Sequence, residues 1–311
     1  YFYYRYCRYI SAFSKTRYSK IISIYRILFL QLILGFLPSN CDLLTSITEL
    51  IGLGNPNDVR EYDFIIVGGG SAGCVLANRL SENPEWNVLL IEADAAPSPL
   101  PYIPILVTAL WRPPTAFQQT ADPDNNFCLG QEKQACSEVR GRILGGSSGI
   151  NGMIYARGSP EDYNGWAEAG TEGWNYTYVL PYFKKLENIV EESLQNENHG
   201  VGGPQKVAYF TDSVTDSSVQ LLHELVYNGS IENGVPYYDD IGVKCSYGIG
   251  RGLATKTLDK RQSTYTSYIE PISNRKNLHI LENAYVTKIL TKGNEAYGVT
   301  FYDGISYINV T

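Results

Sequence analysis

The chain has 311 residues, which is enough for two domains or one elaborate domain at roughly 100–200 residues each. Hydrophobic residues make up 44% and charged residues 18%, so a disordered or collagen-like chain is excluded. The formal net charge is −7, and because residues 1–41 carry six cations and no acid, the rest of the chain is more acidic still. An acidic body without a basic stripe repels phosphate backbones, so we expect no nucleic-acid partner.

The N-terminal segment 1–41 resembles an export signal. A cationic, tyrosine-rich start precedes an apolar run at 27–37. Eleven residues are too few to span a bilayer comfortably, since a transmembrane helix needs roughly 17–25 residues. We expect a cleaved signal, a secreted protein and no stable membrane span, with a mis-predicted upstream segment or an amphipathic flank as the alternatives. Three Asn-x-Ser/Thr sequons, at Asn175, Asn228 and Asn309, are compatible with secretion.

The cysteines and histidines predict no metal site. The six cysteines form no C-x-x-C pair, and none of the three histidines lies four residues from another. Cys128 and Cys136 flank a short polar loop and could form a local disulfide in an oxidising compartment, whereas Cys74 lies in an apolar helical pattern and is expected to be buried and free.

Residues 62–92 have the order strand, glycine turn, helix, strand and acid. The apolar run 62–67 predicts a fully buried parallel strand, and the next six residues, Gly68–Gly73, fit G-x-G-x-x-G. A helical pattern then runs to 83–84, and 88–91 is a second strand closed by Glu92. This order is typical of a unit that binds the ADP half of FAD or NAD.

Each residue type in this unit has a physical role. Gly68 permits the tight turn, Gly70 lets the backbone approach a pyrophosphate, and Gly73 lets the helix pack against the strand. The free amides of the first helical turn face the phosphates, and Glu92 accepts hydrogen bonds from the ribose hydroxyls. The predicted cofactor-binding residues in this unit are Gly68, Gly70, Ser71, Ala72, Gly73 and Glu92.

A second glycine cluster, at 141–158, is a more specific motif than the first unit, which does not distinguish FAD from NAD. Its pattern, G-R-I-L-G-G-S-S-G-I-N with Tyr155 and Gly158 following, resembles the glucose–methanol–choline (GMC) family of flavoprotein oxidoreductases. Stretches at 174–185, 261–264 and 277–286 resemble the insect branch of that family, with its glucose dehydrogenase-like and ecdysone oxidase-like members. The resemblance implies an α/β fold: a Rossmann-like FAD-binding domain with a parallel sheet, and an incomplete α+β substrate domain with an antiparallel sheet.

The resemblance also implies flavin contacts beyond the first unit. The residues expected near the phosphate and ribityl groups are Gly145, Gly146 and Ser147. Those expected against the isoalloxazine ring are Asn151, Gly152 and Met153, and Val286 is expected to meet the adenine through its backbone. Some relatives tether the flavin through a His before the Asn; this chain has Ile150 there, which predicts non-covalent FAD.

The reaction implied is the oxidation of an alcohol CH–OH group, with hydride transfer to the flavin and quinone or oxygen as electron acceptor. The family's base is a His near the C-terminus paired with a His or Asn, and no such pair exists here. The catalytic residues therefore stay unknown, and we expect His199, His223 and His279 to be structural or solvated. Because the chain stops just after a strand-like run at 298–302, we expect a fragment.

We divide the chain into a leader (1–41), a first part of the FAD-binding domain (60–165), a partial substrate domain (166–255) and a return to the FAD-binding domain (256–311). A helix is predicted at 178–189, and strands at 278–281, 286–290 and 298–302.

Three alternative functions stay open: flavin binding without turnover, an NAD(P)-dependent dehydrogenase, and a serine hydrolase that uses G-G-S-S-G at 145–149 as a nucleophile elbow.

Overall fold

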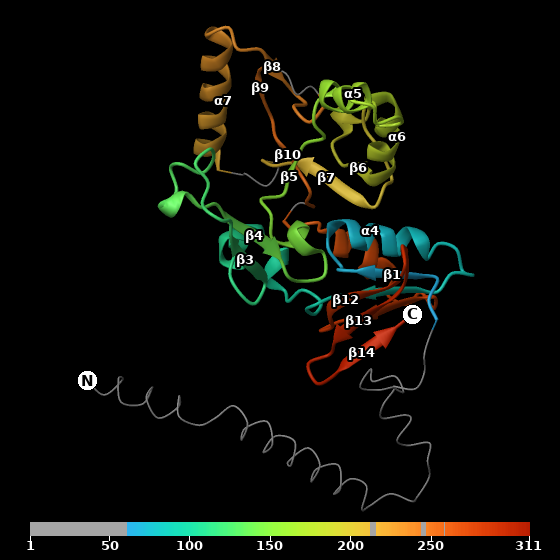
Figure 1. Ribbon diagram of the computed structural model, residues 1–311. Coiled ribbons are helices and arrows are strands. Elements are labelled where there is room, and N and C mark those ends of the chain that lie inside the picture. Colours follow the sequence, from blue (N-terminus) through green and yellow to red (C-terminus); the bar gives the residue numbers. More distant parts are fainter. Residues whose placement is uncertain (1–60, 212–215, 244–246, 258) are drawn as a thin grey trace, which may run out of the picture. The chain divides into compact units, whose positions relative to one another are not determined.

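The computed structural model describes residues 61–211, 216–243, 247–257 and 259–311, which belong to one compact unit (Figure 1). The expected leader at 1–41 lies outside the described residues. Among the described residues no helix is long and apolar enough to cross a membrane. The fold is mixed α/β, with a three-stranded parallel sheet, a four-stranded mixed sheet, a three-stranded antiparallel sheet and two two-stranded sheets.

The parallel sheet has the strand order β1 (Phe64–Val67), β2 (Val88–Ile91) and β11 (Leu278–Leu281). Every residue of the central strand β2 is buried, because its side chains alternate between two covered faces. Val88 and Leu90 pack with helix α4 (Ser71–Leu80) and with Ile269. Leu89 and Ile91 pack instead with Val299 and Phe301, which belong to a second sheet.

That second sheet is the antiparallel meander β12 (Tyr285–Lys292), β13 (Glu295–Tyr302) and β14 (Tyr307–Val310). The three predicted strands in this part of the chain are confirmed, and the turn at Gly293, with φ +63°, joins the first two strands of the meander. The parallel sheet therefore lies between α4 and the meander (Figure 1).

The prediction for β1 is partly wrong. The strand and its parallel pairing with β2 are present, but only Ile66 is buried and Val67 is 53% exposed. The strand β1 is only partly buried because, among the described strands, it lies at the edge of the sheet. Val67, at its end, lines the cavity described below.

A four-stranded sheet has the order β5 (Ile154–Tyr155), β10 (Leu253–Ala254), β7 (Gln205–Tyr209) and β6 (Glu187–Ile189). Its β10 strand is antiparallel to both neighbours, whereas β6 and β7 run parallel, so the sheet is mixed. The helices in this part of the chain are α5 (Pro160–Glu168), α6 (Tyr176–Leu186) and α7 (Ser217–Glu232).

The helix predicted at 178–189 ends earlier than expected. Helix α6 stops at Leu186, where Glu187 takes an extended conformation, and residues 187–189 form β6. The pairing of β6 with β7, which lies about twenty residues further along the chain, decides this boundary. No local pattern in the apolar residues reports such a partner.

The remaining strands form two small pairs: β3 (Ala116–Thr120) with β4 (Ser137–Gly141), and β8 (Tyr237–Tyr238) with β9 (Ile249–Gly250). The predicted disulfide is present between Cys128 and Cys136, in the loop that joins β3 to β4, and Cys74 is buried and free. Short helical turns are η1 (Leu100–Tyr102), η2 (Pro104–Leu110), η3 (Glu132–Gln134), η4 (Gly146–Gly149), η5 (Glu192–Leu194), η6 (Tyr265–Ile269) and η7 (Glu270–Ile272).

Candidate functional site

The first glycine turn connects β1 to the N-terminus of α4. Gly68 has φ +92°, a left-handed conformation that favours glycine, and it turns the chain at the end of the strand. Gly70 is the N-cap of α4 and provides no side chain to cap the helix. The first helical hydrogen bond is donated by Cys74 to Gly70, so the amides of the first turn precede the helical ladder and are available to an anion.

The glycines of this turn differ in what surrounds them. A Cβ on Gly73 would lie 2.0 Å from the Gly68 carbonyl oxygen, so this position must be glycine for α4 to pack against β1. A Cβ on Gly70 would meet nothing within 4 Å, and the φ of Gly70 is −76°. The space beside Gly70 is thus open to a ligand rather than filled by the protein.

The two glycine stretches, about seventy residues apart in sequence, are in direct contact. The Gly145 amide donates to the Gly69 carbonyl at 2.7 Å, and a Cβ on Gly146 would lie 2.7 Å from the Gly70 Cα. Gly145 and Gly146 achieve this approach with φ of +93° and +51°. The Gly69 amide in turn donates to Glu92 Oε2 at 2.7 Å, so the acid is tied to the same turn.

A cavity of about 430 Å³ opens where these segments meet, within the range of about 300–1,000 Å³ typical of ligand pockets. Five of the predicted site residues line it: Gly68, Gly70, Glu92, Gly146 and Val286. The Glu92 side chain is fixed by two backbone donors, Gly69 to Oε2 and Asp94 to Oε1, and each oxygen keeps a further acceptor position. An elongated ligand can therefore be held by amides at one end and by a carboxylate further along.

The other predicted residues do not line this cavity. Ser71, Ala72 and Gly73 form the first turn of α4, and Ser147 Oγ accepts the Gly141 amide at 3.1 Å. Asn151 and Gly152 are exposed, whereas the Met153 side chain is buried with φ +65°. Gly145 lies beneath the contact with Gly69, against Ser263 and Tyr265.

Sequence reasoning missed the contribution of the β3–β4 hairpin. Phe117 and Gln119 of β3 line the cavity, and the Arg142 guanidinium lies 5.2 Å from the Phe117 ring centre. Arg142 Nε also lies 3.6 Å from Asp94 Oδ2. No motif marks Phe117 or Gln119 in the sequence; only the pairing of Ala116 with Gly141 brings their strand beside the second glycine cluster.

None of the three histidines lines the cavity. His199 is buried between Glu187 and Asp240, with ring nitrogens 3.0 Å and 2.7 Å from their carboxylate oxygens. His279 lies in β11 with Nδ1 2.9 Å from the Tyr62 hydroxyl, and His223 lies on α7. Within the described residues no group of three or more His, Cys, Asp or Glu side chains is placed to hold a metal ion.

The serines of the second cluster are used structurally. Ser148 Oγ donates to the Gly145 carbonyl at 2.6 Å and accepts the Thr264 amide at 3.0 Å. The turn η4 that contains both serines is a four-residue 3₁₀ turn, whereas a nucleophile elbow needs a strand, a sharp turn and then a helix. The serine hydrolase hypothesis therefore lacks its required structure.

The parallel sheet, the glycine turn at a helix N-terminus and the acid that closes β2 define a dinucleotide-binding unit. Residues 62–309 match the family described as GMC oxidoreductase, so the chain belongs to this family. The predicted resemblance, the fold class and FAD as the cofactor are confirmed. The nicotinamide and hydrolase alternatives are set aside by this match.

The chain is 37% identical over 264 residues to "Glucose dehydrogenase [FAD, quinone]" from Drosophila pseudoobscura pseudoobscura, covering 85% of this chain and 41% of that protein. It is 36% identical to "Ecdysone oxidase" from Spodoptera littoralis, covering 77% and 40%. The solved structure of pyridoxine 4-oxidase from Mesorbium loti is similar, with a TM-score of 0.72, 29% identity, and coverage of 80% and 48%. The chain thus spans about two fifths of the length of these curated relatives.

Proposed function

We propose that this chain is the flavin-binding part of an oxidoreductase that oxidises the CH–OH group of a small-molecule alcohol and passes the electrons to quinone or oxygen. The observation that carries the proposal is the contact between two separated glycine stretches at one cavity of about 430 Å³. The family match and the names of the relatives support the class of reaction.

The residues present fit FAD. The uncapped first turn of α4, including Ser71 and Ala72, would hold the pyrophosphate, and the open space beside Gly70 admits it. Glu92 would accept hydrogen bonds from the ribose hydroxyls, and Val286 would lie beside the adenine. When bound, FAD would supply the hydride acceptor for the alcohol carbon. This chain would orient the cofactor, and we assign no catalytic base among its described residues.

The test is a Gly70→Ala variant. Alanine is compatible with φ −76° and its Cβ meets no atom within 4 Å, so the protein should fold unchanged while the methyl group occupies the pyrophosphate space. We expect FAD affinity, measured by flavin fluorescence titration, to fall at least about tenfold, which corresponds to about 1.4 kcal/mol. Gly130→Ala, which also meets nothing within 4 Å, is the matched control. Equal affinity in both variants would refute the site.

Flavin binding without turnover is the alternative function. It predicts the same response to Gly70→Ala but no bleaching of the bound flavin when alcohols are added anaerobically. Bleaching by any alcohol in a panel would exclude this alternative and begin to identify the substrate.

We further propose that FAD is bound non-covalently and that the protein is exported. Ile150 carries no nucleophile for a covalent link, and acid precipitation should release the flavin into the supernatant.

The Cys128–Cys136 disulfide is typical of an oxidising compartment, which supports export. Secretion from cells expressing the open reading frame, followed by a glycosidase-sensitive mass, would support this localisation, whereas a reduced and intracellular product would contradict it.

A further inference from the structure

Arg261 is a buried cation without an anionic partner. Its residue is 1% exposed, the largest side chain among the fully buried ones, and it lies in the segment that leads from β10 to η6. None of the ion pairs within the described residues includes Arg261. Burial lowers the pKa of Arg261 to about 10, so the guanidinium stays charged at neutral pH. Burying a charge without a counter-ion lowers the stability of the folded protein, so a buried, unpaired Arg261 points to a functional role.

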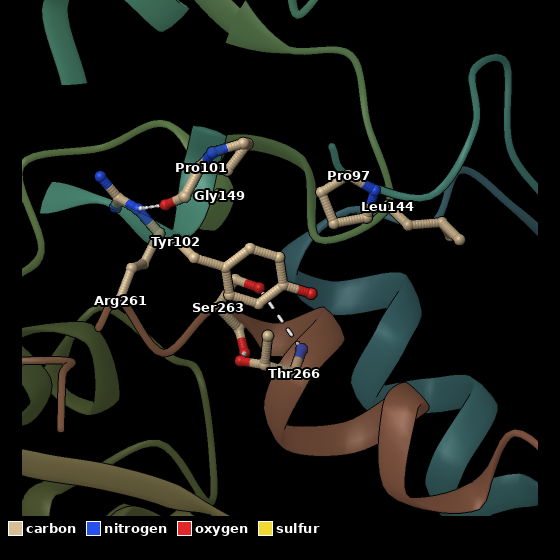
Figure 2. A pocket seen from close by; sticks show the side chains of 8 residues that line it. All are labelled: Pro97, Pro101, Tyr102, Leu144, Gly149, Arg261, Ser263 and Thr266. Carbon is tan, nitrogen blue, oxygen red and sulfur yellow. Dashed lines mark hydrogen bonds between the residues drawn. The ribbon is translucent and has the colours of Figure 1, made fainter. Parts of the chain in front are cut away.

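The guanidinium of Arg261 connects the loop after β2 to the second glycine cluster. Nε donates to the Pro101 carbonyl at 2.9 Å (Figure 2), and Nη1 donates to the Ser148 carbonyl at 3.3 Å and to Asn151 Oδ1 at 2.8 Å. Nη2 is buried and bonds to no atom in the described part of the chain. The cavity that adjoins Arg261 has a volume of about 10 Å³, room for about one water molecule, so no ligand larger than water fits there.

Asn151 transmits the effect of Arg261 to the protein surface. Its Oδ1 accepts both Arg261 Nη1 and the Met153 amide, the latter at 3.0 Å, and two donors at one oxygen fix the orientation of the side-chain amide. The Asn151 residue is exposed, and both hydrogen bonds of its side chain within the described residues are at Oδ1 rather than Nδ2. Asn151 therefore presents only N–H donors outward, with a positive charge behind them.

We propose that Arg261 is a positioning residue that holds Asn151 as an obligate hydrogen-bond donor to the flavin ring and favours the reduced, more negatively charged form of FAD. This inference rests on the proposed function, because it requires the isoalloxazine ring beside Asn151. The guanidinium polarises the Asn151 amide, and a donor polarised by a cation binds an acceptor more strongly as the negative charge on the acceptor increases.

The test compares how tightly reduced and oxidised FAD bind, through the midpoint potential of the flavin in the loaded chain. In Arg261→Gln the preference for reduced FAD should fall about tenfold or more, which is a drop of about 30 mV for a two-electron couple. Arg261→Lys keeps the charge and should lie close to the wild-type potential. Arg275→Gln is the matched control, because Arg275 donates to Asn78 and Ser81 at the far end of α4 and should leave the potential unchanged.

An unchanged potential in soluble, FAD-loaded Arg261→Gln overturns the proposal, and so does a drop of equal size in Arg261→Lys. If Arg261→Gln does not fold, Asn151→Ala decides, since the exposed Asn151 side chain can be truncated without opening the core. It should show the same drop, and a wild-type potential in Asn151→Ala refutes the role of Asn151. A wild-type chain that binds no FAD refutes the proposed function itself, which is a distinguishable result.

Discussion

The buried network around His199 predicts a loss of stability in alkaline solution. Glu187 accepts the Arg157 guanidinium, the Gly200 amide and the His199 ring, and the other ring nitrogen of His199 meets Asp240. Two carboxylate partners require both ring nitrogens to donate, which only the imidazolium form can do. Burial opposes this charge, but the hydrogen bonds to Asp240 and Glu187 outweigh it and raise the pKa of His199 to about 9 from 6.5.

A group whose pKa is higher in the folded than in the unfolded state binds its proton more tightly when folded. The contribution of His199 to the free energy of unfolding is therefore complete below pH 6.5 and is lost as the pH rises through about 9. The pKa difference of about 2.5 units at 1.36 kcal/mol per unit amounts to about 3 kcal/mol. Folded proteins typically have a free energy of unfolding of about 5–15 kcal/mol, so the protonation of His199 would supply about a third of a mid-range value.

Urea unfolding at a series of pH values from 6 to 10 measures this contribution. The free energy of unfolding of the wild type should fall by about 3 kcal/mol more over that interval than that of His199→Gln, which has no imidazole to titrate. The comparison of slopes removes the effect of tyrosines and lysines common to both proteins. His223→Gln, at a histidine on α7, is the control and should follow the wild type. Parallel curves for wild type and His199→Gln would refute the assignment of His199 as a buried imidazolium.

Two further stability predictions follow from buried or cross-linked groups. Arg157→Met leaves the buried Glu187 carboxylate without its arginine, and we expect a loss of about 3–5 kcal/mol in urea unfolding at pH 7; a loss below about 1 kcal/mol would contradict a buried pair. Replacing Cys128 and Cys136 together by serine opens a loop with a sequence separation of 8 residues, and the chain-entropy relation gives a loss of about 2.5 kcal/mol. Equal melting temperatures under reducing and oxidising conditions would show that the cross-link contributes nothing.

The sequence predicted the dinucleotide unit well because its signals are local. Buried parallel strands read as short apolar runs, and the glycines between them are required by backbone geometry, as the 2.0 Å approach of a Cβ on Gly73 to Gly68 shows. That both glycine stretches would lie along one flavin was expected only from a resemblance, since no spacing rule joins two stretches so far apart, and the contact of Gly145 with Gly69 was not predicted.

Features that depend on distant partners were beyond local patterns. The end of α6 is set by the pairing of β6 with β7, and the partial exposure of β1 is set by a cavity. The charge on His199 depends on Asp240, 41 residues away, so an isolated His in an Asn/Gly-rich loop gives no sign of it. Residues 261–264 contributed to the family resemblance, but nothing in the sequence indicates that Arg261 is buried, since an arginine next to a polar loop is normally exposed to solvent.

The order β1-β2-β11 has a consequence for how the protein is made. Val88 of the central strand pairs with Leu278, which leaves the ribosome 190 residues later. At roughly 5–20 residues per second, an apolar edge of β2 is left uncovered for about 10–40 s of translation. During this interval the nascent chain offers a bare strand to other polypeptides, so its yield in cells should depend on elongation rate and on chaperones that shield such an edge.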